Sequence, residues 1–311
     1  MDRRRQVLAA GALLVVTAIW GGTFVPVQEA LRSFPMLPFL AYRFLGSAVV
    51  LAVIFFRDLQ RMTRRTFAWG LVVGVFLAAG YIGQTWGLEH LSVPTVAFVT
   101  GLFVVFTPLL TFAVTRKRPA NLTWLGVLPA TVGLYVITGG ITRFGLADLV
   151  VLASAIAFAA QILAMESGVH RFPYGSLVVA EMAVTGLICA LGALMSGGLP
   201  RPATTSVWEG LAATGVLAGA LAYWVQAVVQ RYISGTRTAV IMTTEPLFAA
   251  CTAYVWQGVM LPPSGMAGAA FIVAGVLLIE VVPNTSLPSW AMQLVRSVIG
   301  ARTTKARAEE P

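Results

Sequence analysis

Charged residues are scarce in this sequence. Asp, Glu, Lys and Arg make up 11% of its 311 residues, whereas 58% are hydrophobic. A soluble globular domain usually has about 25% charged residues. The composition therefore excludes an ordinary soluble enzyme, a disordered chain and a nucleic-acid-binding module, and it favours a multi-pass membrane protein.

The sequence also has few of the residues that build catalytic and metal sites. Its two cysteines, Cys189 and Cys251, stand in separate apolar runs, and neither His90 nor His170 has a partner at metal-ligand spacing. A phosphate-binding loop of the GxxxxGKS or GxxxxGKT type is absent, as is any loop long enough for a soluble catalytic domain. We therefore expect no metal, no cofactor, no ATP-driven step and no enzymatic activity.

Long apolar runs are what the sequence does have. A helix that crosses a bilayer needs about 20 apolar residues, and runs of that size recur between charged or Pro/Gly-rich breaks. The first run has no small-residue cleavage site behind it, so we interpret it as an uncleaved span rather than a signal peptide. The ten expected spans cover residues 7–27, 36–56, 67–88, 94–115, 122–140, 147–165, 175–196, 208–230, 236–257 and 264–283.

The distribution of Lys and Arg predicts the orientation. With a cytoplasmic N-terminus, 16 of the 21 basic residues fall on inner segments, and only Arg32, Arg143 and Arg201 fall on outer loops. The positive-inside rule then places both termini in the cytoplasm of a cell whose plasma or inner membrane holds the protein. We therefore interpret the net charge of +9 as the result of basic inner segments that face anionic membrane lipid, and we expect no nucleic-acid partner.

Residues 284–311 are expected to form a cytoplasmic tail. Trp290, Leu294 and Val298 share one helical face within it, and Arg296 and Arg302 lie nearby. A short helix on the inner membrane surface over 286–301 fits this pattern, and so does a frayed tail.

The chain contains an internal repeat. Four identical pairs lie 142 positions apart: Tyr81 and Tyr223, Gln84 and Gln226, Ser92 and Ser234, and Ala97 and Ala239. The pattern predicts two five-helix repeats over residues 7–140 and 147–283. Because five is odd, the repeats would insert in opposite orientations. Many secondary transporters have this inverted architecture, in which a site between the halves opens to either side of the membrane.

Several short motifs follow one another along the chain. They are Trp20–Phe24, Pro38, Arg43-Phe44, Thr100–Leu110, Gly145–Leu149, Gln230–Tyr232 and Glu245–Ala250. In this order they resemble the EamA-type transporters of the drug/metabolite transporter superfamily, over residues 10–282. Many members of that family have Gly-Glu just after the ninth helix, whereas Val255–Met260 contains no acid. Any role tied to that carboxylate is therefore not carried over.

The resemblance implies an all-helical, ten-span secondary carrier that generally exports small metabolites, amino acids or drug-like amphipathic compounds. A non-transporting membrane scaffold or receptor with the same fold is the alternative. An intramembrane enzyme would need clustered acids, histidines or metal ligands, whereas Glu181 and Glu245 are dispersed. A monomer and a homodimer both remain open, because a ten-helix carrier can work alone and glycine-rich faces can also support a dimer.

Glu245 is the first candidate for a transport residue. It falls near the middle of the expected span 236–257, where a charge costs at least about 2.5 kcal/mol on insertion scales. It can bind substrate or a proton, which makes the proton the candidate coupling ion, or it can fix helix packing through a hydrogen bond. The following Pro246 and the earlier Pro108 are hinge candidates, since proline removes a helix hydrogen bond.

Arg43 and Glu181 are the other charges inside expected spans that need a reason. Arg43 can receive the carboxylate of a zwitterionic or anionic substrate, or it can pair structurally with an acid or with helix-end carbonyls. Glu181 can line an inner vestibule, or it can pack between helices or at the lipid interface.

Polar and aromatic residues occupy matched places in the third and eighth expected spans. Tyr81 and Gln84 share one helix face, as do Tyr223 and Gln226, and Trp224 lies beside the second pair. These faces can flank a central substrate pocket, which Trp20 can also face. The alternative is that the glutamines hold the helices together by hydrogen bonds.

Overall fold

The computed structural model describes residues 3–91, 93–116, 119, 121–139, 145–258 and 260–280, and the regular structure in these ranges is entirely helical. The predicted tail helix over 286–301 lies outside the described residues. The helices are α1 (Arg3–Leu31), α2 (Met36–Ile54), α3 (Phe56–Gln60), α4 (Arg64–His90), α5 (Val93–Gly101), α6 (Phe103–Thr115), α7 (Asn121–Thr138), α8 (Leu146–Val169), α9 (Tyr174–Met195), α10 (Thr205–Ala212), the π-helix η1 (Ala213–Leu221), α11 (Ala222–Val229), α12 (Gly235–Met242), α13 (Glu245–Gln257) and α14 (Pro263–Glu280).

Seven helical segments in the described ranges are long and apolar enough to cross a membrane, as a multi-pass membrane protein requires. Two further apolar helices, 123–138 and 263–279, are shorter. The expected span 236–257 is divided between α12 and α13, and neither of these has membrane length alone. The membrane-length segments are Arg4–Thr23, Met36–Ile54, Arg64–His90, Thr95–Thr115, Leu146–Val169, Tyr174–Met195 and Thr205–Val229.

Two of the expected spans are interrupted at their middle. The span 94–115 turns at Leu102, between α5 and α6, and the span 236–257 turns at Thr243 and Thr244. Pro246 lies in the first turn of α13, where a missing N–H costs nothing. Pro108 instead lies inside α6, so the turn at Leu102 precedes it by six residues. Its role as a hinge stays a prediction.

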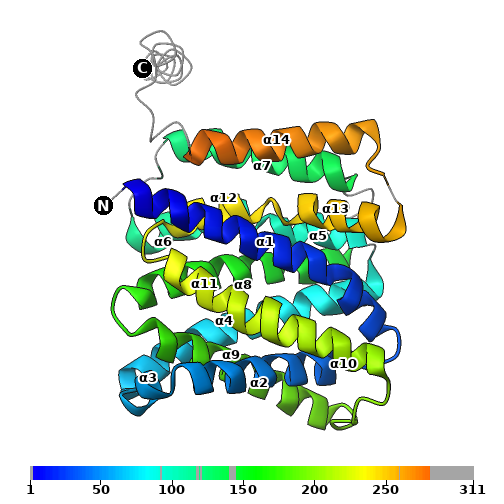
Figure 1. The fold of residues 1–311 in the computed structure, drawn as a ribbon. Coiled ribbons are helices and arrows are strands. Elements are labelled where there is room, and N and C mark those ends of the chain that lie inside the picture. Colours follow the sequence, from blue (N-terminus) through cyan, green and yellow to red (C-terminus); the bar gives the residue numbers. More distant parts are fainter. Residues whose placement is uncertain are drawn as a thin grey trace.

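The helices pack in pairs that relate the two halves of the chain. Figure 1 shows α7 beside α14 at one side of the bundle, and α2 beside α9 at the other. Between these pairs, α4 packs on α8, and α1 packs in the corresponding way on α10, η1 and α11. Likewise α4 packs on α9 as η1 packs on α2, and α8 packs on α6 as α1 packs on α13. Each of these contacts therefore has a counterpart in which both helices are replaced by the equivalent helices of the other half.

Glycines allow the close approach of α7 and α14. A Cβ atom at Gly133 would lie 2.6 Å from the carbonyl oxygen of Gly268, and one at Gly275 would lie 2.6 Å from that of Gly126. Gly126 and Gly268 are 142 positions apart, as are Gly133 and Gly275. The contact is therefore antiparallel and reciprocal, and it uses the same spacing as the tyrosine and glutamine pairs.

Candidate functional site

A cavity of about 740 Å³ lies between the two halves of the chain, within the usual range of roughly 300–1,000 Å³ for small-molecule sites. Of the eight pocket candidates predicted from the sequence, all except Trp224 line it: Trp20, Arg43, Tyr81, Gln84, Tyr223, Gln226 and Glu245. Trp224 instead packs edge-on against Phe55, with ring centroids 5.6 Å apart. Helices α1, α2 and α4 of the first half and α8, α11 and α13 of the second contribute to the walls.

The cavity opens at one end of the bundle and is closed at the other. Its lining reaches the exposed side chains of Arg32 and Glu89, where α1 and α4 end. Toward the opposite end, Gln230 Nε2 donates to the carbonyl oxygen of Ile162 at 2.9 Å, which ties α11 to α8. Beyond it, the Glu166 carboxylate accepts from the backbone N–H of Gly235 at 2.9 Å and ties α8 to the start of α12.

Arg43 is a buried cation at the cavity wall, with 5% of its surface exposed. One of its terminal nitrogens donates to the Tyr81 hydroxyl at 3.3 Å. Its guanidinium lies 5.0 Å from the centre of the Phe44 ring and 4.9 Å from that of Tyr81, within the range of cation–π attraction. Its Nε has no hydrogen-bond partner among the described residues. The aromatic rings thus hold the guanidinium without neutralising it.

Tyr81 and Tyr223 join the two matched faces. The Tyr223 hydroxyl donates to the Tyr81 hydroxyl at 3.0 Å, so the residues that the repeat relates also meet. Trp20 packs on Tyr223, with ring centroids 5.3 Å apart, and donates its indole N–H to the carbonyl oxygen of Ala218 at 2.8 Å. Ala218 belongs to η1. A π-helix breaks the usual pattern of backbone bonds and is often found at functional sites.

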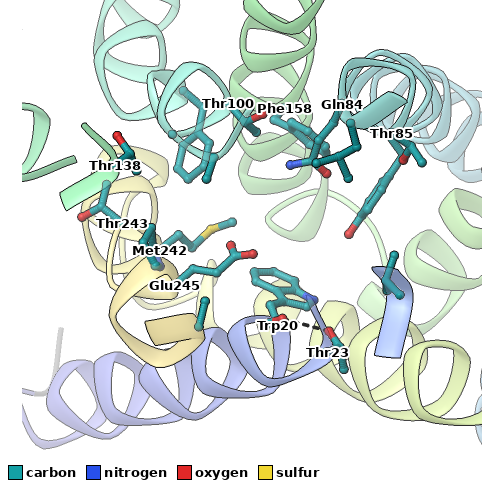
Figure 2. A pocket seen from close by; sticks show the side chains of 18 of the residues that line it. Trp20, Thr23, Gln84, Thr85, Thr100, Thr138, Phe158, Met242, Thr243 and Glu245 are labelled. Carbon is teal, nitrogen blue, oxygen red and sulfur yellow. Dashed lines mark hydrogen bonds between the residues drawn. The ribbon is translucent and has the colours of Figure 1, made fainter. Parts of the chain in front are cut away.

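Glu245 begins α13 at the helix break, and Figure 2 shows its carboxylate pointing into the cavity. Gln84 and Phe158 lie on the opposite wall in that view. Gly21 of α1 permits the close contact behind it, because a Cβ atom there would lie 2.8 Å from the carbonyl oxygen of Glu245 and 2.7 Å from the backbone nitrogen of Ala249.

Arg43 and Glu245 line the same cavity, but among the described residues they form no ion pair with each other. In the part of the chain that the structure describes, no ion pair involves either side chain. Apart from Arg32 and Glu89 at the opening, the remaining walls are apolar or neutral, and they include Phe39, Phe103 and Phe158. The arrangement suits a small molecule that carries one negative group, one positive group and an apolar part. Among the described residues, no cluster of His, Cys, Asp or Glu could hold a metal ion.

A fully buried acid lies behind the cavity, on α9. Glu181 is 0% exposed, which excludes the lipid-interface role considered for it. Its Oε1 accepts from Gln161 Nε2 at 2.6 Å, and Gln161 Oε1 accepts from Gln226 Nε2 at 3.4 Å. Both glutamines line the cavity. Sequence reasoning missed Gln161, which stands in an apolar run without a matching polar residue in the other repeat.

Both halves of the chain, residues 7–139 and 145–281, match the EamA-like transporter family, as the motif resemblance predicted. An uncharacterized transporter from Archaeoglobus fulgidus is 28% identical over 280 residues, which cover 89% of this chain and 87% of that protein. A probable terminal-alkyne amino-acid exporter from Streptantibioticus cattleyicolor is 24% identical over 293 residues, which cover 88% of this chain and 93% of that protein.

A solved crystal structure superimposes on this chain with a TM-score of 0.75. The two proteins are 15% identical, and the superposition covers 90% of this chain and 98% of the other. At this level of identity the likeness concerns the fold alone.

Proposed function

The chain belongs to the EamA-like transporter family, and on that basis we propose that it is a secondary carrier of small zwitterionic metabolites, with neutral amino acids as the leading class. It exports them across the plasma or inner membrane by alternating access. The proton is its coupling ion.

The proposed carrier crosses the membrane ten times, as two inverted five-helix repeats with cytoplasmic termini. The reciprocal glycine contact of α7 and α14 supports this architecture, as does the duplication of the other helix contacts. The two helix breaks support it as well, since each falls at the same place in its repeat: α6 begins at Phe103 and α13 begins at Glu245, 142 positions later. The count of ten includes the divided segment of α12 and α13.

The observation that carries the proposal is the pair of unneutralised charges on the cavity wall. Arg43 comes from the first repeat and Glu245 from the second. A buried cation without an anion is costly, and the carboxylate of an amino acid would supply two acceptors in the geometry that a guanidinium fits. Glu245 would then receive the amino group, and the phenyl rings would receive an apolar side chain. The exporter from Streptantibioticus cattleyicolor supports this substrate class and direction, since its name states amino-acid export.

The cavity and the repeats together support alternating access. With the orientation predicted from the basic residues, the opening at Arg32 and Glu89 faces outward. The inner end is closed by the bonds of Gln230 and Glu166. If the repeats exchange conformations, the closure moves to the outer ends of α1 and α4, and the cavity opens inward.

Counterflow in proteoliposomes tests the proposal without any imposed ion gradient. Vesicles loaded with unlabelled L-leucine should accumulate external labelled L-leucine transiently, whereas vesicles without protein should not. The variant Glu245→Gln should weaken this exchange, because the amide cannot neutralise the amino group. L-Leucinol, which lacks the carboxylate, should compete poorly.

A membrane scaffold or receptor predicts a different outcome. Folded and inserted protein that exchanges no member of a panel of neutral amino acids would remove the amino-acid assignment. Binding of those amino acids without any exchange would favour a receptor.

A further inference from the structure

The buried carboxyl group of Glu181 lacks the partners that a buried anion needs. Its Oε1 has one donor, Gln161 Nε2, and its Oε2 has no hydrogen-bond partner among the described residues. No basic side chain forms an ion pair with it in the described part of the chain. A carboxylate that is removed from water needs pairing or several donors to remain charged. Glu181 therefore lacks the contacts that would hold it permanently charged.

Few charged or titratable groups face Glu181 from the elements packed against α9. Helix α11 contributes Tyr223, which interacts electrostatically with Glu181 and also with Tyr81 of α4 and Arg43 of α2. From α8, Gln161 bonds Glu181 directly, whereas Glu166 is engaged with Gly235. From α3, Asp58 lies at the start of α9, against Gly175. Glu181 and Arg43, the proposed carboxylate site, thus share Tyr223 as a neighbour.

A chain of two amides connects Glu181 to the cavity. Gln226 donates to Gln161, and Gln161 donates to Glu181, so every donor points toward the acid. Gln161 and Gln226 are 2% and 1% exposed, and both line the cavity. The Oε1 of Gln226 is buried and has no partner among the described residues. This order of donors suits a Glu181 that is charged and can only accept.

We propose that Glu181 is the binding site of the coupling proton and that Gln161 and Gln226 transmit its protonation state to the substrate cavity. This inference rests on the proposed transport function. Glu181 takes one proton from a hydronium ion in the cavity, so that an O–H bond of that ion breaks as the carboxyl O–H bond forms, and it later returns the proton to water by the reverse step. The protonated acid donates to Gln161 Oε1 once both amides have turned over. Gln161 Nε2 then donates to Gln226 Oε1, the acceptor that lacks a partner in the present arrangement.

When the amides of Gln161 and Gln226 turn over, the hydrogen-bonding groups at the cavity wall change. While Glu181 is charged, the amide nitrogen of Gln226 is engaged with Gln161, and once Glu181 is protonated that nitrogen is released. The hydrogen-bonding groups that the cavity offers to a substrate therefore depend on whether Glu181 is protonated, so substrate affinity should differ between the two states. Thermodynamic linkage relates the two effects: if pH alters the affinity for substrate, then substrate binding must release or take up protons. The number of protons exchanged equals the slope of log affinity against pH.

The test measures proton exchange and counterflow on the same protein. L-Leucine is added to purified carrier in weak buffer, and proton release or uptake is followed with a pH indicator. Wild type should give a proton signal, and Glu181→Gln, which mimics the protonated acid, should lose it. The same variant should lose the stimulation of labelled L-leucine counterflow by a pH gradient. The matched control Glu209→Gln changes an exposed carboxylate on α10 and should keep both responses.

The outcomes separate the two proposals. Wild-type counterflow without a proton signal, or an undiminished signal in Glu181→Gln, overturns the Glu181 assignment and leaves transport intact. Absence of counterflow in wild type overturns the proposed function itself. If Glu181→Gln fails to fold, Glu181→Asp keeps the carboxyl group and should shift the pH midpoint of the proton signal. An unchanged midpoint in that variant would also overturn the assignment.

Discussion

Replacement of Arg43 by Lys separates a carboxylate-binding role from a structural one. The side chain is buried, is held by one hydrogen bond of 3.3 Å to Tyr81, and lies over two aromatic rings. Lys keeps the positive charge but loses the planar pair of donors that a carboxylate can accept together. A positive side chain also remains between the rings, so the cavity should persist.

The expected loss can be worked from the hydrogen bonds. A bond to a charged group contributes about 1.5–3 kcal/mol, and Lys should lose one of two such bonds to the substrate. Since about 1.4 kcal/mol corresponds to a tenfold change, binding of L-leucine should weaken by roughly 10- to 140-fold. L-Leucinol has no carboxylate, so its affinity should change little. The comparison of both ligands in both proteins isolates the interaction, as a double-mutant cycle does.

The assay is the half-saturation concentration for labelled L-leucine in counterflow. Arg201→Lys is the matched control, because Arg201 is exposed and does not line the cavity. Equal weakening of L-leucine and L-leucinol by Arg43→Lys would show a general disturbance of the cavity. Unchanged affinity for L-leucine would refute carboxylate binding by Arg43.

Two further predictions concern packing and are measured by the melting temperature in detergent. Gly133→Ala places a methyl group 2.6 Å from the Gly268 carbonyl oxygen, and this overpacking should lower the free energy of unfolding by about 1–3 kcal/mol. The control Gly11→Ala meets no atom within 4 Å and should leave the melting temperature unchanged. Trp20→Phe removes the hydrogen bond to Ala218 in η1. Because a buried carbonyl then lacks a donor, the variant should lose about 1–3 kcal/mol of stability, and an unchanged melting temperature would show that η1 does not need this bond.

The apolar helices and seven of the eight pocket candidates were predictable because each depends on a pattern within the sequence. A bilayer fixes the length of an apolar run, and the expected spans overlap helices in the described residues, where seven helical segments have membrane length. The repeat spacing identified Tyr81, Gln84, Tyr223 and Gln226, and all four line the cavity. The same spacing relates the four glycines of α7 and α14, a signal that the sequence already contains.

The errors and omissions have physical reasons. Trp224 follows Tyr223 directly, and successive residues of a helix point about 100° apart, which turns the Trp224 ring toward Phe55 instead of the cavity. Gln161 and Glu181 were missed as a pair because the bond between them joins α8 to α9. Neither residue has a polar counterpart at the repeat spacing, where Ile19 and Phe39 stand. Contacts of this kind depend on how helices pack, and no periodicity along the chain encodes them.

The helix packing and the charges of this protein differ in their relation to the internal repeat. Helix contacts and helix breaks are duplicated between the halves, whereas the charges are not. At the repeat spacing, Arg43 corresponds to Thr185 and Glu245 corresponds to Phe103. Under the proposed alternating access, duplicated contacts would let the two halves exchange conformations at little cost, because the same interfaces would be present in both states. Single charges would keep one orientation of the proposed zwitterion throughout that exchange, since its carboxylate could face only Arg43. In this proposal the repeat accounts for the alternation of access, and its violations account for the selection of the substrate.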